Sequence, residues 1–183
     1  MSHSTYRLQS IALVPIGKVE EYSLEALEEE LPKIFRGAAC RRVKLSINVE
    51  QFSRRNSKQY HSTKMLSALE RYQPIVGADR LLAITDLDLY IPTMNFVFGE
   101  AQLPGKVAII STRRLKDTTD CGGEDLFSIR IVKEAVHELG HTLGLAHCQD
   151  TACVMFFSNS LKDTDQKREH YCTKCAAKLG DYI

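Results

Sequence analysis

Residues 137–147 read HELGHTLGLAH and hold three of the six histidines in the chain. His137 and His141 are four residues apart, so on an α-helix their side chains lie on the same face, one turn from each other. Both imidazoles can therefore reach one metal ion. Glu138 follows the first histidine and would flank that metal without binding it, which is the position of a general base. The spacing predicts a metal-binding helix with a carboxylate beside the metal.

The second half of this stretch supplies a third candidate ligand. Gly144 can adopt a positive φ without a Cβ clash, so the helix can end there and the chain can turn back. That turn would bring His147 beneath the helix as a third nitrogen ligand. Three histidines leave one tetrahedral position open for water, and an open position distinguishes catalytic zinc from structural zinc. A surface helix with scattered histidines is the weaker interpretation, because five fixed residues at this spacing rarely arise by chance.

A second cluster follows the histidines immediately and consists of cysteines. It comprises two pairs, Cys148 with Cys153 and Cys172 with Cys175. This layout is typical of a structural zinc site, in which four thiolates fill the coordination shell and exclude water. Two disulfides, or unpaired buried thiols, are the alternatives, and His170 could replace one cysteine. Because Cys148 directly follows His147, the second metal would also help to fix the third histidine.

The composition indicates an ordinary globular protein. The chain has 183 residues, of which 44% are hydrophobic and 26% charged, so it is long enough for one domain with its own core. Lys+Arg 24 and Asp+Glu 23 almost cancel, which gives no reason to expect a nucleic-acid partner. No apolar run approaches the roughly 18–20 residues of a membrane span, and residues 1–10 lack the blocks of a signal peptide. We therefore expect a cytoplasmic protein with no membrane partner, whose cysteines are thiols or metal ligands.

Strand-like and helix-like patterns alternate before the metal motif. Helices are predicted over residues 23–36 and about 62–73, and the metal-binding helix follows them. Strands are predicted over 11–17, 42–49, 80–86, 106–112 and part of 87–101, where Pro92 interrupts the run. In 42–49 hydrophobic and polar residues alternate, as in a half-buried strand. In 80–86 nearly every residue is apolar, as in a sheet covered on both faces.

These elements predict an α/β (α+β) fold class, with a mixed twisted sheet of about five strands and the metal-binding helix packed against it. We expect residues 1–183 to form a single domain. Within it, residues 1–144 would supply the sheet and the active-site helix. Residues 145–183 would form a small irregular subdomain that depends on the second metal for stability.

Two further segments have a possible role with a substrate. The polar loop 51–60 contains Arg54, Arg55 and Lys58, which could contact a substrate carboxylate, although a solvated surface is the simpler interpretation. The strand within 94–100 could bind an extended peptide by adding it to a free sheet edge. A core strand without a substrate role explains its pattern equally well.

The combined pattern HExxHxxGxxHC-x₄-C-x-M, followed by CxxC, resembles the archaemetzincin family of the metzincin clan of zinc peptidases. The segments TDLDLY (85–90) and NFVFGEA (95–101) are also similar to that family, and the short chain resembles its archaeal members. The resemblance implies a metzincin-like fold and two Zn²⁺ ions per chain. It places catalytic zinc on the three histidines with Glu138 as general base, and structural zinc on the four cysteines.

The resemblance also bears on two residues beyond the histidines. In metzincins a methionine in a tight turn lies beneath the three ligands, and Met155 is the candidate here, with an ordinary core methionine as the alternative. Several metzincin families carry a tyrosine two residues after that methionine, where its hydroxyl can reach the zinc. This chain has Phe157 at that position, so no hydroxyl is available.

The sequence therefore predicts a zinc metallopeptidase, a hydrolase that acts on a peptide or protein substrate. Zinc would lower the pKa of a bound water toward about 7, and Glu138 would take its proton as the scissile carbonyl is attacked. The alternatives are a zinc-dependent binding or regulatory protein with little turnover, and a hydrolase of non-peptide amides. We expect a monomer, and we expect Cys40 and Cys121 to be inert thiols rather than inhibitory metal ligands.

Overall fold

A computed structural model describes residues 7–116 and 123–183 of the chain. Its main sheet has five strands in the order β2-β1-β4-β7-β6. The strands are β1 (Ser10–Ile16), β2 (Ala39–Arg42), β4 (Arg80–Thr85), β6 (Gly99–Ala101) and β7 (Val107–Ser111). β6 runs antiparallel to β7, whereas the other neighbours are parallel. The predicted mixed sheet of about five strands is therefore confirmed.

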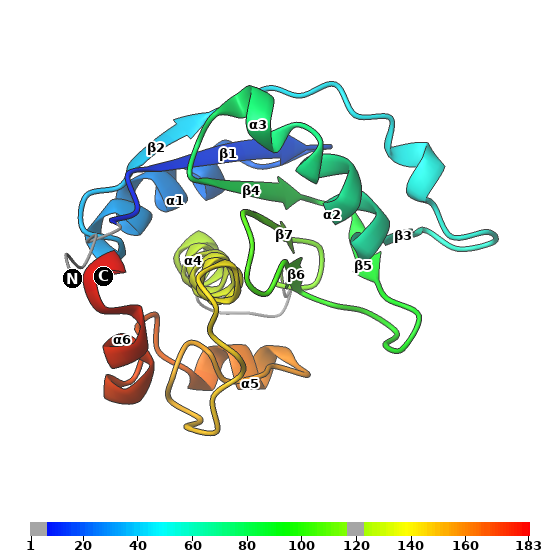
Figure 1. The fold of residues 1–183 in the computed structure, drawn as a ribbon. Coiled ribbons are helices and arrows are strands. Elements are labelled where there is room, and N and C mark those ends of the chain that lie inside the picture. Colours follow the sequence, from blue (N-terminus) through cyan, green and yellow to red (C-terminus); the bar gives the residue numbers. More distant parts are fainter. Residues whose placement is uncertain (1–6, 117–122) are drawn as a thin grey trace.

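The sheet is covered on both faces by helices (Figure 1). α1 (Glu21–Ile34) and α4 (Gly123–Thr142) pack on one face, together with side chains such as Leu82 and Ile84 of β4. α2 (Ser62–Glu70) packs on the other face, against side chains such as Leu81 and Ala83. Adjacent β4 residues thus enter two different hydrophobic cores, the first core beside α1 and α4 and the second core beside α2, which explains why nearly all of the predicted strand over 80–86 is apolar.

Short elements complete the fold. α3 (Gln73–Val76) follows α2, and the 3₁₀ helix η1 (Val49–Phe52) precedes a two-stranded parallel sheet of β3 (Gln59–His61) and β5 (Asp88–Tyr90). After α4 come α5 (Leu161–Gln166) and α6 (Thr173–Leu179), which lie below α4 in Figure 1, and then the 3₁₀ helix η2 (Gly180–Tyr182). None of the helices in the described parts of the chain is long and apolar enough to cross a membrane.

The prediction of a strand over 42–49 was wrong. Regular pairing with β1 covers only Ala39–Arg42; the N–H of Val43 still donates to the carbonyl oxygen of Leu13, but residues 44–48 have no strand partner among the described residues. The alternation itself is present, because Val43, Leu45 and Ile47 are half-buried against the second core while their neighbours are exposed. An alternating pattern reports which side chains are buried, whereas strand assignment also needs a hydrogen-bonded neighbour.

Two predicted elements are also shorter in the structure than in the sequence pattern. The helix expected over 62–73 ends at Glu70, and α3 forms separately after it. Of the strand expected within 94–100, only Gly99 and Glu100 belong to β6, which ends one residue later. β6 is therefore a strand of three residues that begins at Gly99, close to Glu138 of α4.

Replacing Leu27 by alanine tests the packing of α1 against the metal-binding helix. Leu27 is fully buried in the first core, so the Leu27→Ala variant should lose about 2–5 kcal/mol of unfolding free energy. Glu25, exposed on the same helix, provides the control: Glu25→Ala should change stability by less than about 0.5 kcal/mol. Denaturant unfolding of both variants measures the difference, and equal stabilities would contradict this packing.

Candidate metal centres

Three histidines from two segments meet at the C-terminal end of α4. His137 and His141 lie one turn apart on the helix, and Gly144, with a φ of 95°, turns the chain back so that His147 approaches them. One ligand nitrogen from each ring can be chosen so that all three lie within 4.8 Å of one another. His147 also contacts Phe157, with 4.8 Å between the ring centroids.

Hydrogen bonds determine which ring nitrogens face each other. Nδ1 of His137 donates to the carbonyl oxygen of Val154 over 2.8 Å, and Nδ1 of His141 donates to that of Leu145 over 2.7 Å. Because a carbonyl only accepts, the protons are on Nδ1 and the lone pairs are on Nε2. The two Nε2 atoms lie 3.1 Å apart, an arrangement that is repulsive unless a cation is bound between them. The donor set therefore fits a metal ion.

Burial favours the neutral, metal-binding form of these imidazoles. It lowers the pKa of His137 well below its usual value and that of His141 to about 4. The pKa of His147 is also lowered, first by burial and then by the positive charge of Lys167. A neutral imidazole binds a metal without first losing a proton, so the three histidines can bind a metal ion near neutral pH.

Glu138 lies beside the histidines and is almost completely buried, with 4% of its surface exposed. Its Oε2 has no hydrogen-bond partner among the described residues. Burial, and then the negative charge of Glu134, raises the pKa of Glu138 well above its usual value. A Cβ atom at Gly99 of β6 would lie 2.6 Å from Oε1 of Glu138. Only glycine therefore allows β6 to pass this close to the carboxylate.

Met155 lies beneath the histidine-bearing turns of α4. It is fully buried, and a Cβ atom at Gly140 would lie only 2.5 Å from its sulfur. The backbone N–H of Cys148 donates to the carbonyl oxygen of Met155 over 2.9 Å. Met155 thus occupies the place, under the ligands, that the metzincin resemblance implied for it.

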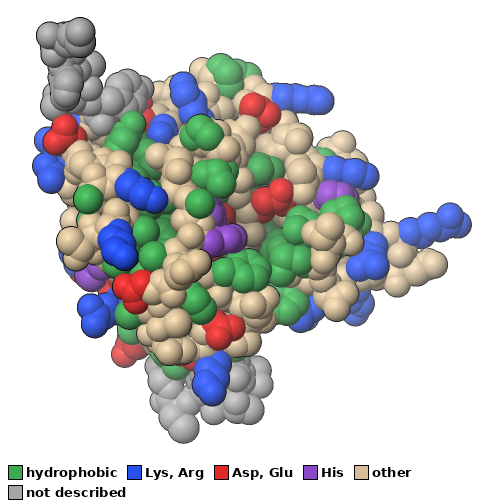
Figure 2. All heavy atoms as spheres, turned by 60° about the horizontal axis from the view of Figure 1, so that its bottom comes forward, with side chains coloured by type: hydrophobic (Ala, Val, Ile, Leu, Met, Phe, Trp, Pro, Cys, Tyr) green, Lys and Arg blue, Asp and Glu red, His purple; other side chains and the backbone are tan. Residues whose placement is uncertain are grey.

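A cavity of about 640 Å³ opens onto the histidines and Glu138. Its walls come from α4, from β6 with the segment before it, and from the chain after His147. Figure 2 looks onto this face, where histidine side chains are visible near the centre with hydrophobic and acidic side chains around them. Most lining residues of the segment 90–98 are apolar or aromatic, among them Ile91, Phe96 and Phe98. The site is therefore open to a ligand much larger than water.

The four cysteines form a second group. One sulfur from each of Cys148, Cys153, Cys172 and Cys175 lies within 4.8 Å of the others, and all four are free thiols. The sulfurs of Cys148 and Cys172 are 3.8 Å apart, far beyond a disulfide bond of about 2.05 Å. A separation of 3.8 Å is close to that of two thiolate sulfurs that each lie about 2.3 Å from the same tetrahedral zinc. The two-disulfide alternative does not fit this geometry, whereas a metal does.

Cys172 sits at the start of α6, where backbone N–H groups favour a thiolate. The backbone N–H of Cys175 is the main cause that lowers the pKa of Cys172 to about 7. His170 is exposed and is not part of the four-sulfur group. Cys40 belongs to neither group, and burial raises its pKa to about 12. Cys121 lies outside the described residues.

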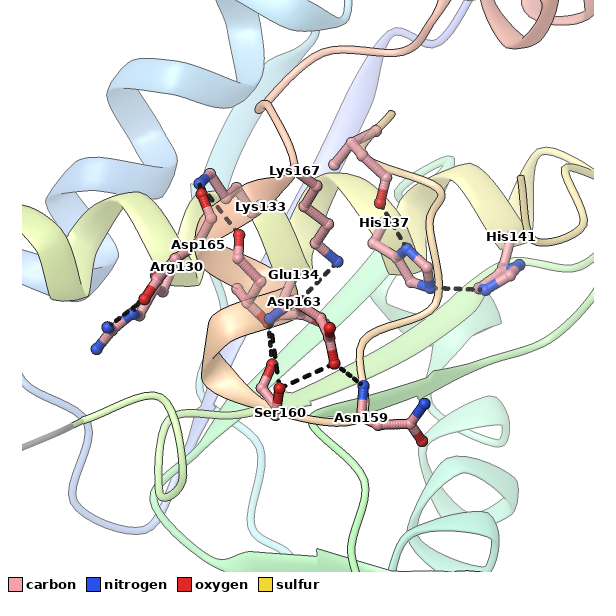
Figure 3. Close-up of polar contacts among 12 residues, drawn as sticks. Arg130, Lys133, Glu134, His137, His141, Asn159, Ser160, Asp163, Asp165 and Lys167 are labelled. Carbon is pink, nitrogen blue, oxygen red and sulfur yellow. Dashed lines mark hydrogen bonds and ion pairs between the residues drawn. The ribbon is translucent and has the colours of Figure 1, made fainter. Parts of the chain in front are cut away.

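A set of charged residues, all buried except Asp165, joins α4 to the segment around α5, and sequence reasoning missed it (Figure 3). Arg130, 2% exposed, donates twice to the carboxylate of Asp165, both times over 2.7 Å. Nζ of Lys133 donates to the carbonyl oxygens of Thr164 and Asp165. Lys167, fully buried, lies 2.9 Å from Oε1 of Glu134, in an ion pair rather than a well-aligned hydrogen bond.

The spacing of these charges along α4 was the signal that could have revealed them. Arg130, Lys133 and Glu134 precede His137, Glu138 and His141 at intervals of three and four residues. They therefore continue the helix face that carries the predicted ligands. Charged residues on a buried helix face need partners. Here the chain after the metal ligands supplies them.

The sequence profile described as peptidase family M54 matches residues 18–181. An archaemetzincin from Methanocaldococcus jannaschii is 39% identical over 179 residues, which cover 95% of this chain and 94% of that protein. The crystal structure of archaemetzincin from Methanopyrus kandleri superposes with a TM-score of 0.81 at 33% identity, over 97% of this chain and 96% of that one.

A crystal structure described as a zinc-dependent peptidase, from Methanocorpusculum labreanum, gives a TM-score of 0.80 at 29% identity. It covers 93% of this chain and 100% of that chain. Sequence and fold thus agree over nearly the whole length, and the resemblance to archaemetzincins is confirmed. This chain belongs to peptidase family M54, the archaemetzincins.

Proposed function

We propose that this chain hydrolyses peptide bonds at the histidine site, with zinc held by His137, His141 and His147. The observation that carries the proposal is the convergence of three neutral imidazoles and a buried carboxylate at the edge of an open cavity. When bound there, zinc supplies a Lewis acid that polarises the scissile carbonyl and makes water a nucleophile near neutral pH.

Glu138 is the proposed general base. Its carboxylate lies beside the histidines, and an oxygen without a hydrogen-bond partner is available to accept a proton from water. Burial makes the protonated form of Glu138 more stable than in water, which strengthens the carboxylate as a proton acceptor. The same group can then return the proton to the leaving amine. Phe157 provides no hydroxyl at the position where several metzincin families carry one, and Glu138 is the group proposed for both proton transfers.

β6 is the proposed binding edge for the substrate backbone. It is the last strand of the main sheet, paired with β7 on one side only, and Gly99 and Glu100 line the cavity. An extended peptide can add to such an edge through main-chain hydrogen bonds, while its side chains enter pockets on either side. Because Gly99 contacts Glu138, a peptide on this edge passes directly in front of the general base.

The four cysteines are proposed to hold a second, structural zinc. Four thiolates complete a tetrahedral shell, which leaves no position for a substrate or a reacting water. The site also ties Cys148, and hence the neighbouring His147, to the C-terminal helix α6. A metal at this position would therefore stabilise the subdomain and the third histidine together.

The Glu138→Gln variant should keep both zincs and lose hydrolysis. Glutamine has the same shape but accepts no proton, so kcat/KM should fall by about 10²–10⁴. Glu124→Gln, exposed on the same helix, should behave as the unchanged protein. Metal content and peptide cleavage should be measured on both variants, and full activity of Glu138→Gln would show that another group is the base.

Cleavage of a mixed peptide library tests the proposed activity itself. The two-zinc protein should produce fragments, and a chelator that empties the histidine site should stop their production. Mass spectrometry of the products with and without chelator measures this. A protein that holds two zincs yet shows no chelator-sensitive cleavage would instead favour the zinc-dependent binding or regulatory function.

Replacing Cys172 by serine tests the second site. The purified protein should contain about two zincs per chain, and Cys172→Ser about one, with a lower unfolding temperature. Cys40→Ser, a change outside both metal groups, should retain two. Metal analysis combined with thermal unfolding gives both quantities. Two zincs retained in Cys172→Ser would rule out a four-thiolate site.

A further inference from the structure

The cavity has a single cationic end. Arg54 is the only arginine or lysine among the described residues that line it, whereas Glu100, Glu134 and Glu138 line the part near the histidines. We propose that Arg54 binds a carboxylate of the peptide substrate, located on the C-terminal side of the cleaved bond. This inference rests on the peptide hydrolysis proposed above and adds a class of preferred substrate to it.

Arg54 is held in place although its side chain is exposed. Its guanidinium lies over the ring of Tyr90, 4.8 Å from the centroid, and Nη1 donates to Oε1 of Gln59 over 3.2 Å. The backbone N–H of Arg54 donates to the carbonyl oxygen of Gln59 over 2.7 Å. Nε2 of Gln59 in turn donates to the carbonyl oxygen of Asn95 in the cavity wall, over 2.6 Å. The loop is thus fastened to the wall, so less side-chain freedom is lost when a ligand binds.

The charge of Arg54 has no partner of opposite sign among the described residues. A nearby arginine shows the contrast. Arg114 lies over the ring of Phe96 in a similar way, at 4.4 Å, but it also donates twice to the carboxylate of Asp88, over 2.6 and 2.8 Å. The salt bridges within the described ranges do not include Arg54. Its side chain has five N–H donors, and Gln59 accepts from one of its nitrogens.

This chemistry selects a carboxylate. A guanidinium presents parallel N–H groups that match the two oxygens of a carboxylate, and such a pair is stronger than a neutral hydrogen bond. The aromatic ring beneath the guanidinium shields one of its faces from water, which strengthens the interaction further. Near the histidines a substrate carboxylate would face the carboxylate of Glu100 and, when zinc is bound, would compete with water for the metal. Among the described side chains that line the cavity, Arg54 is therefore the one that offers a substrate carboxylate a positive charge without occupying the metal.

The direction of β6 indicates on which side of the cleaved bond the carboxylate lies. Gly99 begins β6 against Glu138, and the segment that leads to Arg54, through Asn95, precedes Gly99 in the chain. A peptide that adds antiparallel to β6 runs in the opposite direction. Its residues after the cleaved bond therefore extend toward Asn95 and Arg54. The carboxylate can belong to an Asp or Glu side chain or to the free C-terminus of a short peptide.

A substrate series separates these two sources. A peptide that the library experiment shows to be cleaved is resynthesised with Glu or Gln at each of three positions before and after the bond. A second pair carries a free or an amidated C-terminus. One position after the bond should show kcat/KM about tenfold higher with Glu than with Gln. If the C-terminus is the ligand, the free acid should show this advantage instead.

Variants of Arg54 assign the preference to this residue. Arg54→Gln should abolish the advantage of the carboxylate, and Arg54→Glu should reverse it in favour of lysine at the same position. Arg55→Gln is the matched control, because Arg55 is the exposed neighbour and does not line the cavity. It should keep the preference of the unchanged protein. A preference that survives in Arg54→Gln, or that lies before the cleaved bond, would overturn the proposal.

Binding measurements keep the proposal testable if turnover is absent. Zinc-loaded Glu138→Gln protein, with and without the added Arg54→Gln change, is titrated with fluorescent library peptides that differ only by Glu or Gln. Tighter binding of the Glu peptides, lost with Arg54→Gln, supports the subsite even where the proposed hydrolysis fails. Equal binding of the Glu and Gln peptides rejects the subsite while leaving the hydrolysis intact.

Discussion

The rest of the structure depends on one constraint: the Nε2 atoms of His137 and His141, each with a lone pair, are held 3.1 Å apart in a buried site. An isolated helix would not keep them there, because the rings would rotate away from each other. Each ring is fixed from behind by a carbonyl oxygen, one from Leu145 and one from Val154. Both carbonyls come from the chain after α4. The fold must therefore return that chain beneath the helix, and the turn at Gly144, the buried Met155 and the cysteine group all serve this return.

The returning segment is fastened at two places by different kinds of interaction. Near His147 the fastening is the four-thiol group. Near α5 it is the set of charges formed by Arg130, Lys133 and Glu134 with the more exposed Asp165 and with Lys167, of which Glu134 and Lys167 form a buried ion pair. Buried ion pairs gain little free energy overall, but breaking one by removing a single partner is costly because a charge remains unpaired. These ion pairs therefore fix the position of the returning segment more than they add to its stability.

Helices and strands whose hydrophobic or ligand residues recur at a regular spacing were predictable from the sequence. The spacing of His137 and His141 predicted a shared helix face, and the apolar run of β4 predicted a strand covered on both sides. Long-range pairing was not predictable in the same way. Residues 44–48 continue the alternation of a strand but have no strand to pair with among the described residues, and the partners of Arg130 and Lys133 in the segment around α5 are about 30 residues away in the chain. The place of Arg54 on the cavity wall also depends on contacts with Gln59 and Tyr90 that no local pattern shows.

The contact between Gly99 and Glu138 has a consequence for how such a chain can diverge. Even alanine at position 99 would place a carbon 2.6 Å from an oxygen of the carboxylate, so any larger residue there would have to displace the proposed general base. Phe96, only partly buried in the same wall, can be exchanged for other apolar side chains that widen or narrow the cavity. Mutation can thus alter the shape of the accepted peptide while the reacting groups remain untouched. Within one cavity wall, the residue that shapes the substrate pocket and the residue that makes room for the general base are thus different positions, a few residues apart.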